Sequence, residues 1–489
     1  MTACQPTRSV PAAPAGESAG AWVSLAVVAA GLFLAVTSTT VVSVALPSIG
    51  TDLHATATDL EWIVDAYVIV YSSLLVAGGV MGDRLGRKGL FMAGAATFGA
   101  GSLAAGLAPT VGVLIAARAV QGLGPALLVP GSLTIIRATF ADERRRAVAI
   151  GLWSTASGVA LAVGPALGGG LVEAGGWPWV FLFNVPLAAI LVALAGRLLP
   201  RLPRAQAATR FDWAGAALTT AGVAILAYGT IEGPDLGWAA PLVIAALAAG
   251  VAALVALVAR ERRARGPLID VALFAQPVFT AANVAALVVF FAFVGAIVYF
   301  SAYFQQVQHH TAVTAGINVS AIGVAFALAA SQSGRLVARF GPRRPMLAGL
   351  IIAAAATLGL LRLDQRTGIG AIWWDFALLG AGIGLSLTPM TAVAMSAVDA
   401  AQAGMVSALH NALRQLGQVF GVAVLGALVY ARLPPAASAG RPLPAPQASL
   451  FINGLHHAIW VSGLALLGAA ALAALLFLRQ PPMRNDGQR

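Results

Sequence analysis

The sequence predicts an all-α membrane protein with many transmembrane helices. Of its 489 residues, 59% are hydrophobic and only 10% are charged, and the mean hydropathy is +0.86; soluble globular proteins lie far from these values. Long stretches, such as the one between Asp270 and Arg335, contain no Asp, Glu, Lys or Arg. Because about 20 apolar residues suffice for a helix to cross a hydrocarbon layer of ~30 Å, we expect the chain to lie in a lipid bilayer.

Charged clusters, proline and glycine divide the chain into fourteen predicted spans. Residues 1–21 are rich in Pro, Ala and Ser and are predicted to be a disordered cytoplasmic tail, and residues 479–489 form a second cytoplasmic tail. The apolar run after residue 21 is too long for the core of a signal peptide, so we expect it to remain as a helix. The spans are expected near residues 22–47, 60–81, 89–108, 111–136, 147–172, 178–199, 212–230, 239–259, 278–304, 314–337, 346–362, 372–397, 403–431 and 456–478.

The distribution of the basic residues predicts how the chain is oriented in the membrane. An even number of spans puts both termini on one side, and if that side is the cytoplasm, 23 of the 29 basic residues lie there. Arg118 and Arg414 fall within spans, and only four basic residues are left for the outer side: Arg362, Arg366, Arg432 and Arg441. This distribution follows the positive-inside bias. It accounts for the net charge of +11 without a nucleic-acid partner.

The sequence argues against an enzyme and against a metal site. Its single cysteine, Cys4, excludes an internal disulfide and a cysteine-rich metal centre. The only lysine, Lys88, follows an arginine, so there is no Walker A loop for ATP, and no H-E-x-x-H motif occurs. The pairs His309-His310 and His456-His457 are predicted to be solvated at outer helix ends rather than metal-binding. We expect no cofactor, and an ion gradient as the energy source.

Residues 78–91, GGVMGDRLGRKGLF, place a carboxylate among three basic residues between two apolar runs. The glycines permit a tight turn, and the basic side chains suit a cytoplasmic loop beside anionic headgroups. Asp83 has two interpretations: an incidental charge, or a carboxylate that caps a helix or pairs with an arginine in only one conformation. A similar pattern, LVARFGPRRPML, surrounds Gly341. Repeated halves of this kind are typical of secondary transporters.

The order of residues in GGVMGDRLGRKGLF resembles the loop between helices 2 and 3 of the major facilitator superfamily. The segment LIAARAVQGLGPALLVPGSL is similar to that superfamily's helix-4 motif, and GVALAVGPALGGGLV is similar to its antiporter motif in helix 5. Plain glycine-mediated packing is an equally good physical interpretation of the second segment. The matching positions are Arg118, Gln121, Gly122 and Gly124 in the first segment and Gly158, Gly164, Pro165, Gly168 and Gly169 in the second.

With VSVALPSI, EWIVDAY, FDWAGAAL and NALRQLGQVFGVAV, the match runs from about residue 25 to 478, and the chain is identified as a member of the 14-spanner drug:H+ antiporter-2 family. The resemblance implies a major facilitator fold in the cell inner (plasma) membrane: six-helix bundles at residues 22–199 and 277–478, with two linker helices at 200–276. It also implies that a monomer suffices. The residues that it assigns to a conformational latch are Gly82, Asp83, Arg84, Gly86, Arg87 and Lys88.

The function that we expect is proton-coupled export of small amphipathic drugs or antibiotics by alternating access. The antiporter motif favours export. The alternative is a facilitator-type symporter that imports a small nutrient, and a receptor or scaffold that transports nothing forms a third class. The substrate itself cannot be identified from the sequence.

Four ionisable residues are candidates for proton coupling. Arg118 and Arg414 lie inside spans, where an unpaired charge is costly, so each faces a wet cavity, a functional partner or backbone carbonyls. His410 lies one turn before Arg414 and is either structural or titratable. Asp65 is expected at the depth of Arg118, where the acid and the base could meet. It is either the proton carrier or an interfacial acid that neutralises Arg118.

A departure from the family pattern makes Asp65 important. Relatives usually have an acidic residue nine positions before the proline of ALP, and Ser38 occupies that position here. With the usual carrier absent, the coupling needs another carboxylate, and Asp65 is the best placed in the sequence.

Overall fold

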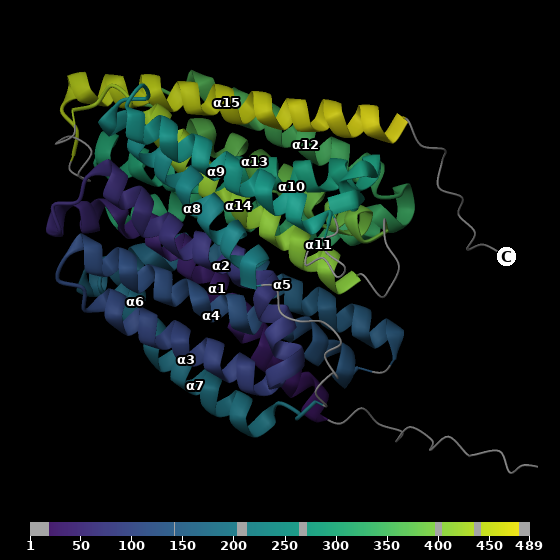
Figure 1. Ribbon diagram of the computed structural model, residues 1–489. Helices are drawn as coiled ribbons and strands as arrows, with labels where there is room; N and C mark the ends of the chain where they lie inside the picture. Colours follow the sequence, from purple (N-terminus) through teal and green to yellow (C-terminus); the bar gives the residue numbers. More distant parts are fainter. Residues whose placement is uncertain are drawn as a thin grey trace, which may run out of the picture.

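Figure 1 shows the computed structural model, in which long helices run side by side. The structure describes residues 19–140, 142–202, 213–263, 271–396, 403–434 and 442–478. All regular structure in these ranges is helical, which confirms the all-α prediction. The elements are α1 (Ala19–Asp52), α2 (Ala57–Leu85), α3 (Arg87–Gly106), α4 (Val111–Thr139), α5 (Glu143–Gly175), α6 (Trp179–Leu182), α7 (Asn184–Leu198), α8 (Trp213–Leu236), α9 (Pro241–Glu261), η1 (Val271–Ala275), α10 (Pro277–Ala302), η2 (Tyr303–Val307), α11 (Ala312–Phe340), α12 (Arg343–Gly359), η3 (Leu360–Arg362), α13 (Ile369–Ser396), α14 (Ala403–Tyr430) and α15 (Ala445–Leu478).

The helices form two groups (Figure 1). In the first bundle, α1 to α7, α4 packs on α2 and α3, α1 packs on α5, and α3 packs on α7. In the second bundle, α10 to α15, α13 packs on α11 and α12, and α10 packs on α14 and α15. The bundles meet along two seams, α5 with α11 and α2 with α14. The additional pair α8 and α9 pack on each other, and α8 contacts α2 and α14 beside the second seam.

Twelve helices within the described ranges are long and apolar enough to cross a membrane. They match twelve of the predicted spans, so the prediction of a multi-span membrane protein is confirmed. The count of fourteen is not confirmed, because α2 and α8, which occupy the predicted spans 60–81 and 212–230, are not among the twelve. The tail predicted at residues 1–21 is too long, since α1 begins at Ala19; residues 1–18 and the tail at 479–489 lie outside the described residues.

The helices alternate in direction, so the bundle has two ends. We call the end where α1 starts and α15 finishes the proximal end, and the opposite end, which carries the α1–α2 connection, the distal end (left in Figure 1). Trp179, Trp238 and Trp374 all lie near the distal end and are 51%, 54% and 61% exposed. Exposed tryptophans at one level are typical of the membrane–water interface.

Glycines end the two helices whose sequences resemble each other. Gly86, after α2, has φ 99°, and Gly341, after α11, has φ 72°. Both values lie in the region that side chains with a Cβ rarely adopt. The repeated pattern therefore forms equivalent proximal turns in the two bundles, as a fold built from repeated halves requires.

Candidate functional site

Arg118 is completely buried in the first bundle, where it ties three helices together. Its Nε donates to the Ile63 carbonyl of α2 at 2.8 Å, and one terminal nitrogen donates to the Ser38 hydroxyl of α1 at 3.2 Å and to Gln121 Oε1 at 2.5 Å. The guanidinium carbon lies 4.3 Å from the centre of the Tyr67 ring. The other terminal nitrogen has no hydrogen-bond partner among the described residues. Arg118 thus makes side-chain as well as carbonyl contacts.

The other residues of the helix-4 motif bring neighbouring helices close to Arg118. Gln121 Nε2 donates to the Ser102 hydroxyl of α3 at 2.7 Å. A Cβ at Gly122 would lie 2.4 Å from the Tyr67 carbonyl oxygen, and one at Gly124 would lie 2.5 Å from Phe98 Cβ. These glycines allow α2 and α3 to approach α4 to distances that any side chain would prevent.

Asp65 does not meet Arg118. Its side chain is fully buried, and neither carboxylate oxygen has a hydrogen-bond partner among the described residues. Ile63 and Tyr67, two positions before and after it, contact Arg118. Because residues two apart point about 200° from each other on a helix, Asp65 projects from the opposite side of α2. The similar depth predicted from the sequence therefore does not produce an acid–base pair.

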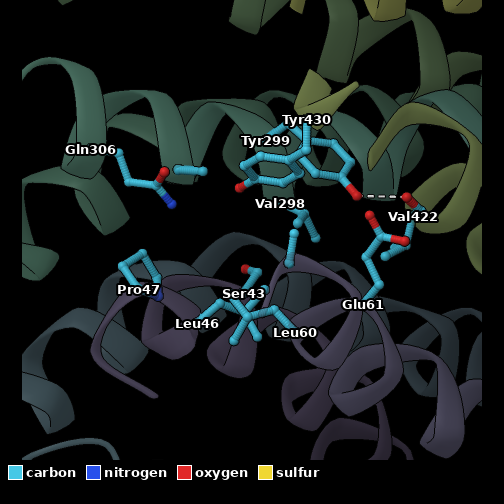
Figure 2. Close-up of a pocket in the computed structure, with 12 residues that line it drawn as sticks. Ser43, Leu46, Pro47, Leu60, Glu61, Val298, Tyr299, Gln306, Val422 and Tyr430 are labelled. Carbon is cyan, nitrogen blue, oxygen red and sulfur yellow. Dashed lines mark hydrogen bonds between the residues drawn. The ribbon is translucent and has the colours of Figure 1, made fainter. Parts of the chain in front are cut away.

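The opposite side of α2 faces the second bundle. The Asp65 carboxylate is near enough to interact electrostatically with the hydroxyl of Tyr299 on α10. One turn earlier, Glu61 is 6% exposed and lines a pocket with Tyr299, Gln306 and Tyr430 (Figure 2). The volume of the pocket is about 20 Å³ in this conformation, which is room for about one water molecule. Glu61 was not among the residues that the sequence singled out; its signal is the i, i+4 spacing from Asp65.

His410 and Arg414 belong to the second bundle. His410 is 2% exposed, and its ring nitrogens lie 3.0 Å from Asn283 Oδ1 and 3.3 Å from Thr391 Oγ1. Arg414 donates to Asn411 Oδ1 at 3.1 Å, and its guanidinium carbon lies 4.2 Å from the centre of the Phe290 ring. The structure therefore places the two candidate arginines, Arg118 and Arg414, in different bundles rather than in one site.

The antiporter-motif residues of α5 lie against both α1 and α11. A Cβ at Gly164 or Gly168 would meet α1, 1.9 Å from Thr40 Oγ1 or 2.6 Å from the Val41 carbonyl oxygen. A Cβ at Gly169 would meet α11, 2.4 Å from the Ala312 carbonyl oxygen. Gly158 lies farther along the same seam, and a Cβ there would be 3.5 Å from Ala327 Cβ. The Pro165 carbonyl oxygen lies against Gly316 of α11. The motif therefore packs the α5–α11 seam between the bundles.

Hydrogen bonds join the bundles toward the distal end. A carboxylate oxygen of Glu173, near the end of α5, accepts from the Val313 backbone N–H at 3.0 Å, in the first turn of α11. Deeper, the Ala166 N–H donates to Ser320 Oγ at 3.2 Å, and Gln305 Nε2 donates to the Val44 carbonyl at 3.1 Å. A carboxylate is favourable at the positive end of a helix dipole. These bonds hold the distal side closed, and nothing in the sequence pattern pairs Glu173 with α11.

The latch residues lie at the proximal turn after α2. Lys88 Nζ donates to the Leu199 carbonyl at 2.8 Å, so this cation bonds within the first bundle. A Cβ at Gly82 would lie 3.7 Å from Cγ of Arg87, across the turn. The side chains of Asp83 and Arg84 lie outside the described residues. Nothing here tests the latch role, which remains a prediction.

The histidine pairs differ from the prediction in one residue of each. His309 and His457 are exposed, as expected. His310 is half-buried and stacks on Phe304 with ring centres 5.7 Å apart, and the Nε2 of the half-buried His456 is 2.8 Å from the Leu363 carbonyl. Phe304 belongs to η2, six residues before His310, and Leu363 follows η3, far from His456 in the sequence. No group of three or more His, Cys, Asp or Glu suited to a metal occurs among the residues that the structure describes.

Comparisons with known proteins agree on a transporter family. The family model described as Major Facilitator Superfamily matches residues 28–422. The chain is 33% identical over 413 residues, 84% of this chain and 76% of the relative, to the tetracenomycin C resistance and export protein of Streptomyces glaucescens. It is 35% identical over 408 residues, 83% and 86% of the two chains, to the methylenomycin A resistance protein of Streptomyces coelicolor. It is 34% identical over 403 residues, 82% and 75% of the two chains, to the multidrug resistance protein Stp of Mycobacterium tuberculosis.

Solved structures share the fold. A bacterial homologue of the lysosomal transporter Spinster, in an inward-facing and unoccupied conformation, superposes with a TM-score of 0.68 at 19% identity and covers 96% of this chain and 100% of that one. A D-xylose–proton symporter superposes with a TM-score of 0.65 at 15% identity and covers 92% and 97%.

Proposed function

This chain belongs to the major facilitator superfamily, and from that premise we propose that it exports small amphipathic drugs or antibiotics in exchange for protons. Relatives that match more than four fifths of the chain are named as drug or antibiotic resistance and export proteins. The names of these relatives are the single observation that supports export rather than import. The ionisable residues buried at and beside the seam between the bundles support the proton coupling.

We also propose fourteen spans, with both termini in the cytoplasm and the chain acting as a monomer. α2 and α8 contain 29 and 24 residues, long enough to cross a bilayer. Acidic residues reduce the apolarity of α2, but Glu61 and Asp65 face the second bundle rather than lipid. The predicted distribution of arginine supports the orientation. Two additional helices between two bundles are what the drug:H+ antiporter-2 resemblance implies.

Alternating access in this chain would proceed by opening the distal contacts. The hydrogen bonds of Glu173, Ser320 and Gln305 and the close α5–α11 packing exist while the distal side is closed. In the opposite state these contacts would separate, and the turn around Gly86 would latch the bundles at the proximal end. A ligand shifts such an equilibrium only through a difference in its affinity for the two states.

Export can be tested by measuring how much of a fluorescent compound accumulates in cells. Cells that express the protein should accumulate less of a fluorescent amphipathic compound than cells without it, and a protonophore should remove the difference. Raised accumulation would indicate an importer, and no change would indicate a protein that does not transport. A difference that survives the protonophore would reject proton coupling while leaving export in place.

Asp65 is the proposed proton carrier. Burial without a partner makes the charged carboxylate costly, so the conformation with a closed distal side favours the neutral acid. We expect Asp65→Asn to bind substrate as the wild type does but to lose substrate-induced proton release, measured with a pH-sensitive dye on purified protein in detergent. Asp52→Asn, which neutralises an exposed acid at the distal end of α1, is the matched control. Undiminished release from Asp65→Asn would clear this residue and direct attention to His410.

A further inference from the structure

The additional helix α8 lies over the second seam between the bundles. It packs on α2 of the first bundle and on α14 of the second, and its partner α9 packs on it (Figure 1). Val223, Ala227 and Ile231 are spaced four residues apart, so they line one face of α8, which we call the α8 stripe. Each is at most 1% exposed. The stripe belongs to one buried cluster with Val419 and Ala423 of α14 and with residues of α2. α8 thus bridges the two bundles.

The second seam differs from the first because it contains acidic side chains. In the first seam the α5 and α11 backbones lie close together, since a Cβ at Gly316 would be 2.2 Å from the Pro165 carbonyl oxygen. In the second seam Asp65 is fully buried. A Cβ at Gly426 of α14 would be 1.9 Å from Glu61 Oε1, so this side chain reaches across the seam. A carboxylate that faces hydrocarbon is costly, so the second seam needs cover that the first does not.

A hydrogen bond attaches α8 to the first bundle near the distal end. Trp62 Nε1 of α2 donates to Glu232 Oε1 of α8 at 3.3 Å. The Trp62 ring also lies 6.3 Å from the ring of Tyr228, one turn before Glu232. Asp65 follows Trp62 by three residues, so its side chain projects about 60° from the direction of Trp62. The contact with α8 therefore covers the side of α2 next to Asp65.

The contact of α8 with α14 is of a different kind. Val419 and Ala423 are apolar, and apolar contact has no preferred direction, so α14 can slide along the α8 stripe while the two helices stay in contact. α8 and α9 pack closely, because a Cβ at Gly250 of α9 would be 2.9 Å from the Leu226 nitrogen. The pair can therefore move as one unit with the first bundle.

We propose that α8 is a lateral seal, which stays attached to the first bundle through Glu232 and Trp62 while α14 slides along it. The seal keeps lipid, and water from the distal side, away from Asp65 while the distal side is closed. Glu232 is then a positioning residue that acts through Trp62. This inference rests on the proposed alternation between two states and gives the additional helix pair a role in it.

Distances between spin labels on the purified full-length protein test which bundle α8 follows. Three cysteine pairs are made in a Cys4→Ser background: Asp52→Cys with Ala239→Cys, Ala239→Cys with Arg366→Cys, and Asp52→Cys with Arg366→Cys. These exposed distal positions lie on the first bundle, the α8–α9 connection and the second bundle, respectively. Adding Gly169→Val, which is expected to separate the distal ends, should lengthen both distances to position 366. The distance between positions 52 and 239 should stay the same.

The pair at positions 52 and 366 reports the separation of the bundles itself. If these two positions separate but position 239 keeps its distance from 366 and moves away from 52, α8 follows the second bundle and the proposal is overturned. If positions 52 and 366 do not separate, the bundles do not alternate, and the sliding seal is rejected together with that alternation.

Loss of the attachment should also cause a proton leak. The measurement uses proteoliposomes that contain a pH-sensitive dye, without substrate. Trp62→Phe removes the N–H donor and Glu232→Ala removes the acceptor. Each should raise the leak by about three- to tenfold, the shift in an equilibrium expected from the loss of one hydrogen bond. Glu232→Gln keeps a side-chain oxygen as acceptor and should leak as little as the wild type. Asp52→Asn, the matched control, should not leak either.

The leak has outcomes that separate the seal from a structural role. An unchanged leak in both Trp62→Phe and Glu232→Ala, at normal levels of inserted protein, would reject the seal while leaving export intact. A leak in Glu232→Gln as large as in Glu232→Ala would overturn the assignment of the hydrogen bond as the attachment. Loss of export without a leak would mean that these residues only support the fold. A wild type that does not lower accumulation in cells would instead reject the proposed function.

Discussion

Replacing Arg118 with alanine is expected to abolish export. The guanidinium connects Ser38 on α1, Ile63 on α2 and Gln121 on α4, and it is fully buried. Its removal leaves several buried acceptors without their donor, at about 1–3 kcal/mol each, and frees α1, α2 and α4 to shift against one another. These helices position Asp65 and Glu61 at the second seam, so the loss extends beyond the arginine itself.

The Arg118 prediction is measured as efflux from preloaded cells, with membrane protein levels and the unfolding temperature of the purified protein recorded in parallel. Arg118→Lys keeps the charge but cannot make the planar, multiple contacts of a guanidinium, so we expect it to retain a small part of the activity. Arg366→Ala removes an exposed distal arginine and should export normally. Full export by Arg118→Ala would show that the contacts are dispensable.

Replacing Gly169 with valine is expected to prevent closure of the distal side and so to stop transport. A Cβ at Gly169 would lie 2.4 Å from the Ala312 carbonyl oxygen and 2.6 Å from Val313 Cα. Both atoms belong to the backbone, which cannot rotate away as a flexible side chain can. The conformation described here would therefore be lost, while a conformation with α5 and α11 separated distally has no such clash.

The neighbouring glycine provides a matched control. A Cβ at Gly170 would meet nothing within 4 Å, so Gly170→Val should transport as the wild type does. Conformation can be followed with Ser320→Cys in a Cys4→Ser background, because Ser320 is 8% exposed in the closed distal seam. Gly169→Val should raise its reaction rate with a membrane-impermeant maleimide, and Gly170→Val should not. Equal export by the two valine variants would contradict this account of the seam.

Local composition was sufficient to predict the fold. The predicted helix bounds differ from the observed ones where contacts with other parts of the chain extend or interrupt a helix. The span predicted at 178–199 matches the span Trp179–Leu198, in which a turn separates α6 from α7; Pro186, just after this turn, lacks an N–H for a bond to the preceding turn. The span predicted at 456–478 starts earlier, as α15 begins at Ala445. Its His456 bonds to the Leu363 carbonyl, so a polar residue that looked like a helix end is instead inside a helix.

For the candidate site, too, the sequence predicted some features and only the structure revealed others. The helix-4 and helix-5 motifs singled out Arg118 and Gly169, but the sequence did not reveal what these residues contact. Ser38 stood out as a missing acid, and the structure makes it an acceptor for Arg118. Glu61 was only a neighbour of Asp65 in the sequence, and its pocket depends on Gly426, far along the chain.

The sequence by itself determined a membrane-embedded helical protein, because the length of apolar runs depends on local composition alone, and the resemblance of its motifs to a family indicated a transporter. Only the tertiary structure decided which side of α2 faces which neighbour. Gly122 lets α2 press its Tyr67 side against α4, and this rotation sends Asp65 and Glu61 toward the second bundle and away from Arg118. Helix rotation depends on close packing between residues far apart in sequence. Residues of similar depth in the membrane can therefore lie on opposite sides of one helix.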